Sequence, residues 1–175
     1  MKIGLLSDTH GNLPATRLAA HLLTNAGALA IFHCGDIGGE SVLAELSAIC
    51  SPKHVPVFAV LGNVDHPASD WCFFPTSSGV EILGRFGEQE VDGKKVAWLH
   101  GDDSSRLQKI LSDQIYDFVF SGHTHCFHDQ QIGKTRWLNP GSAGRGTLKS
   151  CLLLDLKTNL LEQIILPAPE SRGKI

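Results

Sequence analysis

Residues 2–36 read KIGLLSDTHGNLPATRLAAHLLTNAGALAIFHCGD, and this stretch decides the fold class. The apolar run at its start predicts a buried strand. The next segment predicts a helix, with Asn12 placed to cap it, Pro14 in its first turn and Gly27 at its end. A second apolar run, LAIFHCGD, predicts another strand. A strand, a helix and a strand in this order are typical of parallel pairing through a helical crossover.

The same alternation continues through a helix-like stripe at 41–50 and a third apolar strand at 55–63. Residues 64–82 are rich in Pro, Ser and aromatic residues, and we expect an irregular loop there. The remainder predicts a helix over 104–115 and hairpins, one of which turns at Asp92-Gly93. We therefore predict an α/β fold in which two mixed sheets pack face to face with helices outside. Residues 1–175 would form a single domain, with 166–175 as a mobile tail.

Composition limits the classes of function. The formal net charge is −3, and the basic residues form no run long enough for a nucleic-acid surface. No apolar run approaches the roughly 20 residues that a membrane helix needs. The chain opens on a short strand rather than on a signal peptide, and its five cysteines form no CxxC pair. These features lead us to expect a cytoplasmic location, with the cysteines acting mainly as small buried apolar residues.

Polar residues follow five of the predicted strands at the point where each strand ends. Ligands of open α/β sheets bind beyond the carboxyl ends of the strands. We therefore expect these side chains to share one rim. The residues in question are Asp8, His10, Asp36, Asn63, Asp65, His100, His123 and His125.

The types of these residues point to metal chemistry. With Asp65 set aside as a turn residue, the set holds two carboxylates, four imidazoles and one carboxamide, without a thiolate, which suits Mn²⁺, Fe, Zn²⁺ or Ni²⁺. Seven ligands are too many for one ion that must keep an open position, and they fit two ions about 3.5–4 Å apart that share a carboxylate. Each short motif alone is weak, since Asp8-Thr9-His10 can arise by chance and Gly-Asp is common turn chemistry.

Taken together, the motifs resemble those of the calcineurin-like metallophosphoesterases, and in particular the small single-domain bacterial and archaeal phosphodiesterases. The matching pieces run from the start of the chain to about residue 166. They are DTH (8–10), GD (35–36), GNVD (62–65), HG (100–101), GHTH (122–125) and NPGS (139–142).

The resemblance implies a four-layer α/β/β/α sandwich with a dinuclear metal site and divalent ions, manganese being favoured. It implies that Asp36 bridges two ions. The first ion would also be held by Asp8, His10 and His125, and the second by Asn63, His100 and His123. The implied reaction is hydrolysis of a small phosphoester substrate by in-line attack of a hydroxide that bridges the ions.

One position departs from the family. Many larger members have a histidine at the third position of GN-x-D/E that is thought to protonate the leaving group, and here that position is Val64. We hypothesise that His66 replaces it, because its unperturbed pKa lies near working pH; Asp102 is the alternative. Asp65 would serve as a turn residue or as support behind the metal ligands. Arg145 either contacts a substrate phosphate or is an exposed solubilising residue.

Two rival functions remain beside hydrolysis of a small phosphoester: a protein scaffold and a nuclease. A eukaryotic retromer subunit has this fold and serves mainly as a scaffold for partner proteins, with an impaired metal centre. Nucleases of the superfamily carry extra capping domains and DNA-binding surface, which this short acidic chain lacks. The intact set of seven ligands favours the enzyme. The sequence leaves open the native metal, the substrate and assembly into a homo-oligomer.

Overall fold

The computed structural model describes residues 1–66 and 78–167. Eleven strands form two sheets, and three α-helices and one short 3-10 helix complete the described chain. The first sheet has the order β11-β10-β1-β2-β3-β4, in which β1 to β4 run parallel. Its strands are β1 (Lys2–Leu6), β2 (Ile31–His33), β3 (Val57–Ala59), β4 (Val80–Ile82), β10 (Lys149–Asp155) and β11 (Leu161–Leu166).

The second sheet has the order β5-β6-β7-β9-β8. Its three central strands run parallel, and each edge strand pairs antiparallel with its neighbour. The β5–β6 hairpin turns at Asp92 and Gly93, both with positive φ, as a two-residue type I′ turn requires. The strands are β5 (Phe86–Val91), β6 (Lys94–Leu99), β7 (Phe118–Phe120), β8 (Phe127–Ile132) and β9 (Thr135–Pro140).

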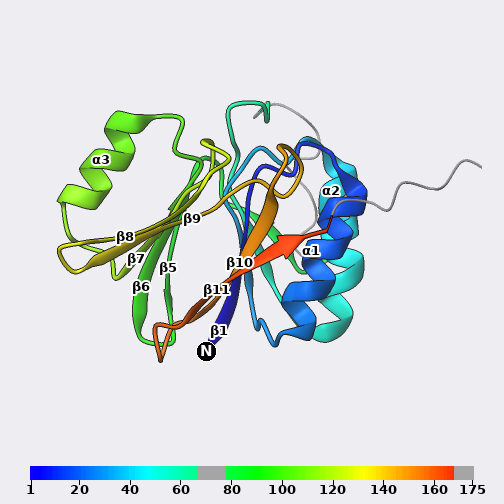
Figure 1. The fold of residues 1–175 in the computed structure, drawn as a ribbon, viewed down its shortest axis with the longest axis horizontal. Helices are drawn as coiled ribbons and strands as arrows, with labels where there is room; N and C mark the ends of the chain where they lie inside the picture. Colours follow the sequence, from blue (N-terminus) through cyan, green and yellow to red (C-terminus); the bar gives the residue numbers. More distant parts are fainter. Residues whose placement is uncertain (67–77, 168–175) are drawn as a thin grey trace, which may run out of the picture.

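The sheets pack face to face, and helices cover both outer faces (Figure 1). Side chains alternate along each strand, so that one sheet can serve two apolar layers. Phe32, Trp98 and Phe120 lie between the sheets, while Ile31 and Val119 face the outer helices. The architecture is therefore the four-layer α/β/β/α sandwich that the sequence predicted.

Two helices cover the first sheet and one covers the second: α1 (Leu13–Asn25) and α2 (Glu40–Cys50), followed by η1 (Ser51–Lys53), and α3 (Ser104–Ser112). The Asn12 side chain accepts a hydrogen bond from Ala15 N at the start of α1, as predicted. Gly4 lets α1 approach β1 closely, since a β-carbon there would lie 2.9 Å from the Leu23 side chain. This close approach positions the turn between β1 and α1, which carries Asp8 and His10.

Three boundaries differ from the sequence prediction. The segment expected to be an irregular loop contains β4, a three-residue strand too short to show a period-2 pattern. Helix α3 ends at Ser112, because Gln114 adopts a left-handed conformation that turns the chain. Leu166, placed in the tail by the prediction, is buried and pairs with Lys149. The aromatic residues of the 64–82 segment, Trp71, Phe73 and Phe74, and the predicted tail beyond Pro167 lie outside the described residues.

Candidate metal centre

The residues singled out by the sequence lie at the carboxyl ends of β1, β2, β3, β6 and β7. Backbone hydrogen bonds join the turns that follow these strands, including His10 N to Asp36 O at 2.9 Å and Gly122 N to His100 O at 2.9 Å. The first of these bonds joins the turns after β1 and β2 of the first sheet, and the second joins the turns after β6 and β7 of the second sheet. Side-chain contacts connect the turns of one sheet with those of the other.

Four of these side chains form a compact cluster. One ligand atom from each of Asp8, His10, Asp36 and His125 lies within 4.8 Å of all the others. The Nε2 atom of His125 lies 3.1 Å from Asp8 Oδ1 and 3.2 Å from His10 Nε2. Both carboxylates are buried, so the charge is concentrated in a region with little water. A group of two carboxylates and two imidazoles at this spacing suits a divalent cation.

A second cluster adjoins the first. The side-chain oxygen of Asn63 lies 3.0 Å from His100 Nε2 and 3.2 Å from His123 Nδ1. Asp36 faces both groups, because its Oδ1 lies 3.3 Å from His100 Nε2 and its Oδ2 lies 3.6 Å from His10 Nε2. The structure therefore brings all seven predicted ligands together, with Asp36 between the two clusters.

Asp8 shows most directly that the cluster fits a cation. Its Oδ2 accepts hydrogen bonds from Ser7 Oγ at 2.6 Å and from the His123 backbone N–H at 3.2 Å. Its Oδ1 is buried and accepts no hydrogen bond from the described residues, because the nearby His125 Nε2, 3.1 Å away, does not have the geometry of a hydrogen bond. Burial raises the pKa of this carboxyl above its usual range. A buried carboxylate oxygen without a donor is costly, and a bound cation would remove that cost.

The ring of His100 is held in one orientation. Its Nδ1 lies 2.9 Å from the carbonyl oxygen of Cys34, an acceptor only, so we assign the proton to Nδ1. In the neutral ring, Nε2 then presents its lone pair to the cluster, as metal-binding histidines commonly do. Burial lowers the pKa of His100, but in the protonated ring the hydrogen bonds to Asp36 and Cys34 outweigh burial, so that the net pKa is raised.

The backbone is left-handed at five of the seven predicted ligands. The φ angles are 54° at Asp8, 46° at His10, 53° at Asp36, 68° at His123 and 58° at His125. Residues other than glycine rarely adopt this conformation, and such strain gathers at functional sites. At the GHTH turn, the left-handed conformation replaces the extended backbone, in which the side chains of His123 and His125 would point to the same face of a strand. His123 thereby reaches Asn63 while His125 reaches Asp8.

Asp65 supports the turns behind the cluster. Its buried carboxylate accepts hydrogen bonds from three backbone N–H groups, those of Ile37 at 3.0 Å, Gly38 at 2.9 Å and Gly62 at 2.9 Å. The first two follow Asp36 and the third precedes Asn63. A single carboxylate thus holds the loops of two candidate ligands in register.

The NPGS segment supports the other side of the rim. Ser142 Oγ donates to the carbonyl oxygen of Asp8 at 2.9 Å, and Asn139 Nδ2 donates to that of Gly122 at 2.7 Å. The sequence alone does not reveal these side-chain contacts. The structure adds these side chains, together with Ser7, which stands directly before Asp8 at the end of β1.

His33 is a buried structural residue. Its Nδ1 accepts from Gly35 N at 3.2 Å, and its Nε2 lies 3.0 Å from Thr9 Oγ1, which donates to Ile37 O. Burial lowers the pKa of His33 to about 4, so the ring is neutral and donates through Nε2. This network ties the turn after β1 to the turn after β2.

The remaining predicted residues lie around the rim. His66 and Arg145 are exposed, and Val64 is 49% exposed. The pKa of His10 is lowered first by burial, and the nearby positive charge of Arg145 lowers it further. Asp102 pairs with Arg85, which also donates to Gly62 O at 3.1 Å. The Asp102 carboxylate is thus occupied as an acceptor, which leaves His66 as the candidate proton donor.

The chain resembles known proteins in sequence and in structure. It is 29% identical to Phosphodiesterase MJ0936 of Methanocaldococcus jannaschii over 144 residues, which cover 81% of this chain and 83% of the relative. A solved archaeal structure, described as a novel phosphodiesterase, superposes with a TM-score of 0.86 at 28% identity, covering 95% of this chain and all of that one.

The same fold occurs in Vps29 of Entamoeba histolytica, solved with Zn²⁺. It superposes with a TM-score of 0.65 at 15% identity, covering 94% of this chain and 99% of that one. Residues 1–159 match the sequence profile of the calcineurin-like phosphoesterase superfamily domain. This match spans all seven clustered residues. The chain therefore belongs to the calcineurin-like phosphoesterase superfamily, whose members hydrolyse phosphoester bonds with the help of bound metal.

Proposed function

We propose that this protein is a phosphodiesterase that acts on a small substrate and uses two divalent metal ions. The observation that carries the proposal is the pair of adjoining clusters that meet at Asp36. The buried Oδ1 of Asp8, which accepts no hydrogen bond from the residues that the structure describes, favours a positive charge at the same place. The preference for diesters is supported by the phosphodiesterase name of the archaeal relative.

In the proposed assignment, Asp36 is shared by both ions. Asp8, His10 and His125 would complete the first site, and Asn63, His100 and His123 would complete the second. Both groups combine oxygen and nitrogen donors without sulfur, which suits Mn²⁺ and also accommodates Ni²⁺, Fe or Zn²⁺. We favour manganese as the native ion.

Divalent ions bound there would supply Lewis acidity, lowering the pKa of water and neutralising charge on a phosphoryl group. The chain's own residues supply position. Ser7 and the His123 N–H hold Asp8 so that one oxygen points into the cluster. The Cys34 carbonyl fixes the ring of His100. Because these groups are ordered before the substrate arrives, they need little reorganisation during the reaction.

His66 is our candidate for protonating the leaving oxygen. Val64 occupies the position where many larger relatives carry a histidine, and it cannot donate a proton. His66 follows the Asn63 turn at the rim, and Asp102 is occupied by Arg85. We expect His66→Ala to slow hydrolysis of a diester with an alkyl leaving group by about 10²-fold or more. The p-nitrophenyl ester needs little protonation and should be affected far less. If the wild type and His66→Ala hydrolyse the alkyl ester at equal rates, His66 is not the proton donor.

Arg145 is our candidate for binding a phosphate oxygen. Its guanidinium has a fork of donors that suits phosphate, and its positive charge influences His10. Its backbone N–H donates to Ser142 Oγ at 2.9 Å, so its position is tied to the NPGS segment that supports Asp8. We expect Arg145→Lys to raise KM with little loss of kcat, because a lysine keeps the charge and loses the fork.

The deciding experiment uses metal-stripped protein with Mn²⁺, Ni²⁺ or Zn²⁺ added back. Bis-p-nitrophenyl phosphate tests diester cleavage, and p-nitrophenyl phosphate tests monoester cleavage. We expect activity only with added metal and a higher kcat/KM for the diester. A preference for the monoester would contradict the phosphodiesterase assignment, while restored activity without any metal would contradict the metal-dependent mechanism.

A scaffold function is the second candidate, because Vps29 shares the fold. The seven clustered residues favour the enzyme, since a scaffold has no need for a full set of ligands. Folded, metal-loaded protein without activity on either ester would favour the scaffold.

The part of the chain that the structure describes has no helix long and apolar enough to cross a membrane. We further propose a single domain in the cytoplasm; sedimentation measurements would decide between a monomer and a homo-oligomer.

A further inference from the structure

An apolar cavity adjoins the candidate metal centre on the side of α3. Its volume is about 550 Å³, within the usual range for sites that bind small molecules. Its floor and walls include Leu107 and Leu111 of α3, Ile132 of β8 and Trp137 of β9. Helix α3 is the one helix that packs on the outer face of the second sheet in the described chain (Figure 1).

The cavity and the metal centre share one turn of the chain. Ser121, Gly122, His123 and Thr124 all line the cavity, and His123 belongs to the second ligand cluster. The turn after β6 contributes Gly101 and Asp102, directly after the clustered His100. A group bound at the metal centre through a phosphate would therefore have this cavity as its neighbour.

The wall formed by Trp137 is suited to a flat ring. The indole N–H donates to Ser121 Oγ at 2.8 Å, and the ring of His128 covers the indole with the centroids 4.1 Å apart. These two contacts hold the indole in place. Asp102 lines the cavity, but its negative charge is paired with Arg85. The cavity therefore favours an uncharged occupant.

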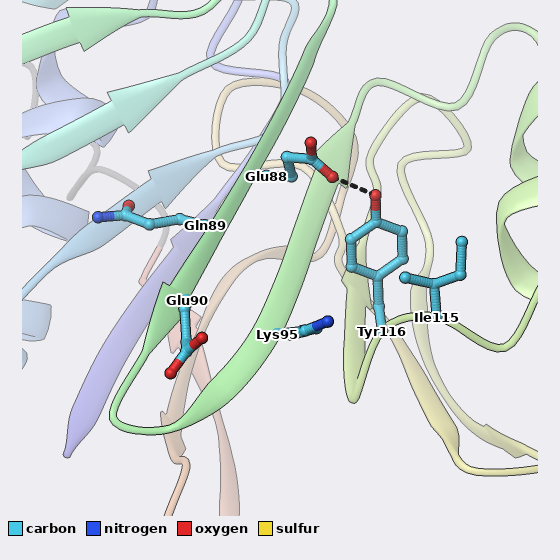
Figure 2. A pocket seen from close by; sticks show the side chains of 6 residues that line it. All are labelled: Glu88, Gln89, Glu90, Lys95, Ile115 and Tyr116. Carbon is cyan, nitrogen blue, oxygen red and sulfur yellow. Dashed lines mark hydrogen bonds between the residues drawn. The ribbon is translucent and has the colours of Figure 1, made fainter.

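A second hollow provides a comparison. It measures about 220 Å³ and is lined by Glu88, Gln89, Glu90, Lys95, Ile115 and Tyr116. Figure 2 shows the Tyr116 hydroxyl turned toward Glu88, to which it donates a hydrogen bond. This hollow is charged and shares no lining residue with the candidate metal centre. Of these two hollows in the described part of the chain, the larger one has the apolar interior and the continuity with the ligand cluster.

We propose that the cavity beneath α3 binds an uncharged, planar ring carried by one ester group of the substrate, and so selects phosphodiesters with an aromatic or heteroaromatic substituent. This inference rests on the proposed function, because the phosphate must be held at the ligand clusters for the ring to reach the cavity. Transfer of a phenyl ring from water to an apolar cavity favours binding by roughly 10- to 100-fold.

The test measures binding of two non-hydrolysable anions to the manganese-loaded protein by titration calorimetry. Phenylphosphonate carries the ring, and methylphosphonate does not. We expect the Kd for phenylphosphonate to be at least about tenfold lower. In protein loaded with diamagnetic Zn²⁺, the Trp137 indole N–H resonance, identified by its absence in Trp137→Phe, should shift on addition of phenylphosphonate but not of methylphosphonate.

Two exposed serines of α3 provide a matched pair of variants. Ser112 lines the cavity and Ser105 does not. Ser112→Trp should fill the cavity and reduce the ratio of the two dissociation constants to about one, with methylphosphonate binding unchanged within about twofold. Ser105→Trp should keep the wild-type ratio. If Ser112→Trp fails to fold, Gln108→Trp fills the cavity from another exposed position on the same helix.

The outcomes separate this inference from the proposed function. Hydrolysis of bis-p-nitrophenyl phosphate with equal affinities for the two phosphonates would overturn the cavity assignment and leave the function standing. A tenfold preference that Ser112→Trp abolishes, without hydrolysis of any ester, would support the cavity and overturn the function. Failure of both anions to bind would overturn the cavity assignment. The cavity assignment would also be overturned if the wild-type protein were a dimer that Ser112→Trp dissociates while the affinities for the two phosphonates stay equal. In that case a second copy of the chain would occupy the cavity.

Discussion

Replacing Asp65 with asparagine tests how the loops that carry Asp36 and Asn63 are held. Asp65 is 3% exposed, and its carboxylate accepts three backbone hydrogen bonds of 2.9 to 3.0 Å. Oδ2 accepts two of them and Oδ1 accepts the third, from Gly38. Asparagine has nearly the same shape, but only one of its two terminal atoms can accept. The variant therefore changes the chemistry with little change in volume.

The expected cost follows from this count. Asparagine can keep the two bonds at the Oδ2 position, but its NH₂ group then faces the N–H of Gly38. One charge-assisted hydrogen bond is lost and a buried donor is left unpaired, which together should destabilise the protein by about 2–3 kcal/mol. Asp65→Ala loses all three bonds and should cost about 3–5 kcal/mol.

Two measurements check the expectation. Urea denaturation of the metal-free protein should show the midpoint of Asp65→Asn lowered by about 1 M, given a typical slope of about 2 kcal/mol per M. Calorimetric titration with Mn²⁺ should show affinity lowered by about 10- to 100-fold, as for other residues that orient metal ligands. Asp103→Asn is the control, because Asp103 accepts one backbone bond at the exposed start of α3.

The reasoning has two clear points of failure. A loss of stability below about 0.5 kcal/mol, or no larger than that of Asp103→Asn, would refute the claim that Asp65 braces the loops. A large loss of stability with unchanged Mn²⁺ affinity would refute the link from the brace to the ligand clusters. In that case, Asp65 would contribute to the fold alone.

Three further predictions concern the ligands, the core and an ion pair. His125→Ala should weaken one Mn²⁺ site and His123→Ala the other, as metal counts at limiting Mn²⁺ would show; equal loss of both ions in both variants would contradict the assignment. Trp98→Ala should cost about 3–5 kcal/mol in urea denaturation, whereas Trp98→Phe should cost clearly less, since the buried indole N–H has no hydrogen-bond partner within the described ranges. The hydrogen bond from Arg136 lowers the pKa of Asp129, so the pair stabilises the fold above the unfolded pKa of about 4 and loses its effect as pH falls through the lower folded value. Asp129→Asn should therefore cost up to about 1 kcal/mol at pH 7 and progressively less in acid, and a cost that does not change with pH would exclude this cause.

Local pattern predicted most of the elements. The spacing of apolar residues located the parallel unit from β1 to β3, and the cap of α1 at Asn12 formed as expected. The Asp92-Gly93 pair predicted its hairpin, because few other residues tolerate two consecutive positive φ angles. The three-residue strand β4 escaped prediction, since its pairing with β3 depends on the sheet rather than on its own sequence.

The candidate site was predictable from residue types and from their places after strands. All seven predicted ligands lie in two adjoining clusters, because the strands that precede them end at a common rim. The supporting residues were harder to foresee. Ser7 and Ser142 are ordinary loop serines in the sequence. Ser7 stands next to Asp8 but nothing local indicates its bond to the carboxylate, and Ser142 contacts Asp8 from a segment 134 residues away.

The sequence by itself determined the order of strands and helices, the family motifs and the chemical types of the ligands, because these depend on local spacing and residue identity. The tertiary structure alone decided which carboxylate oxygen lacks a partner, how Asp36 comes to lie between two clusters, and where an apolar cavity meets His123. These properties depend on distances between segments that are remote along the chain. They also depend on left-handed turns that are unfavourable locally and persist because the surrounding packing and hydrogen bonds hold them.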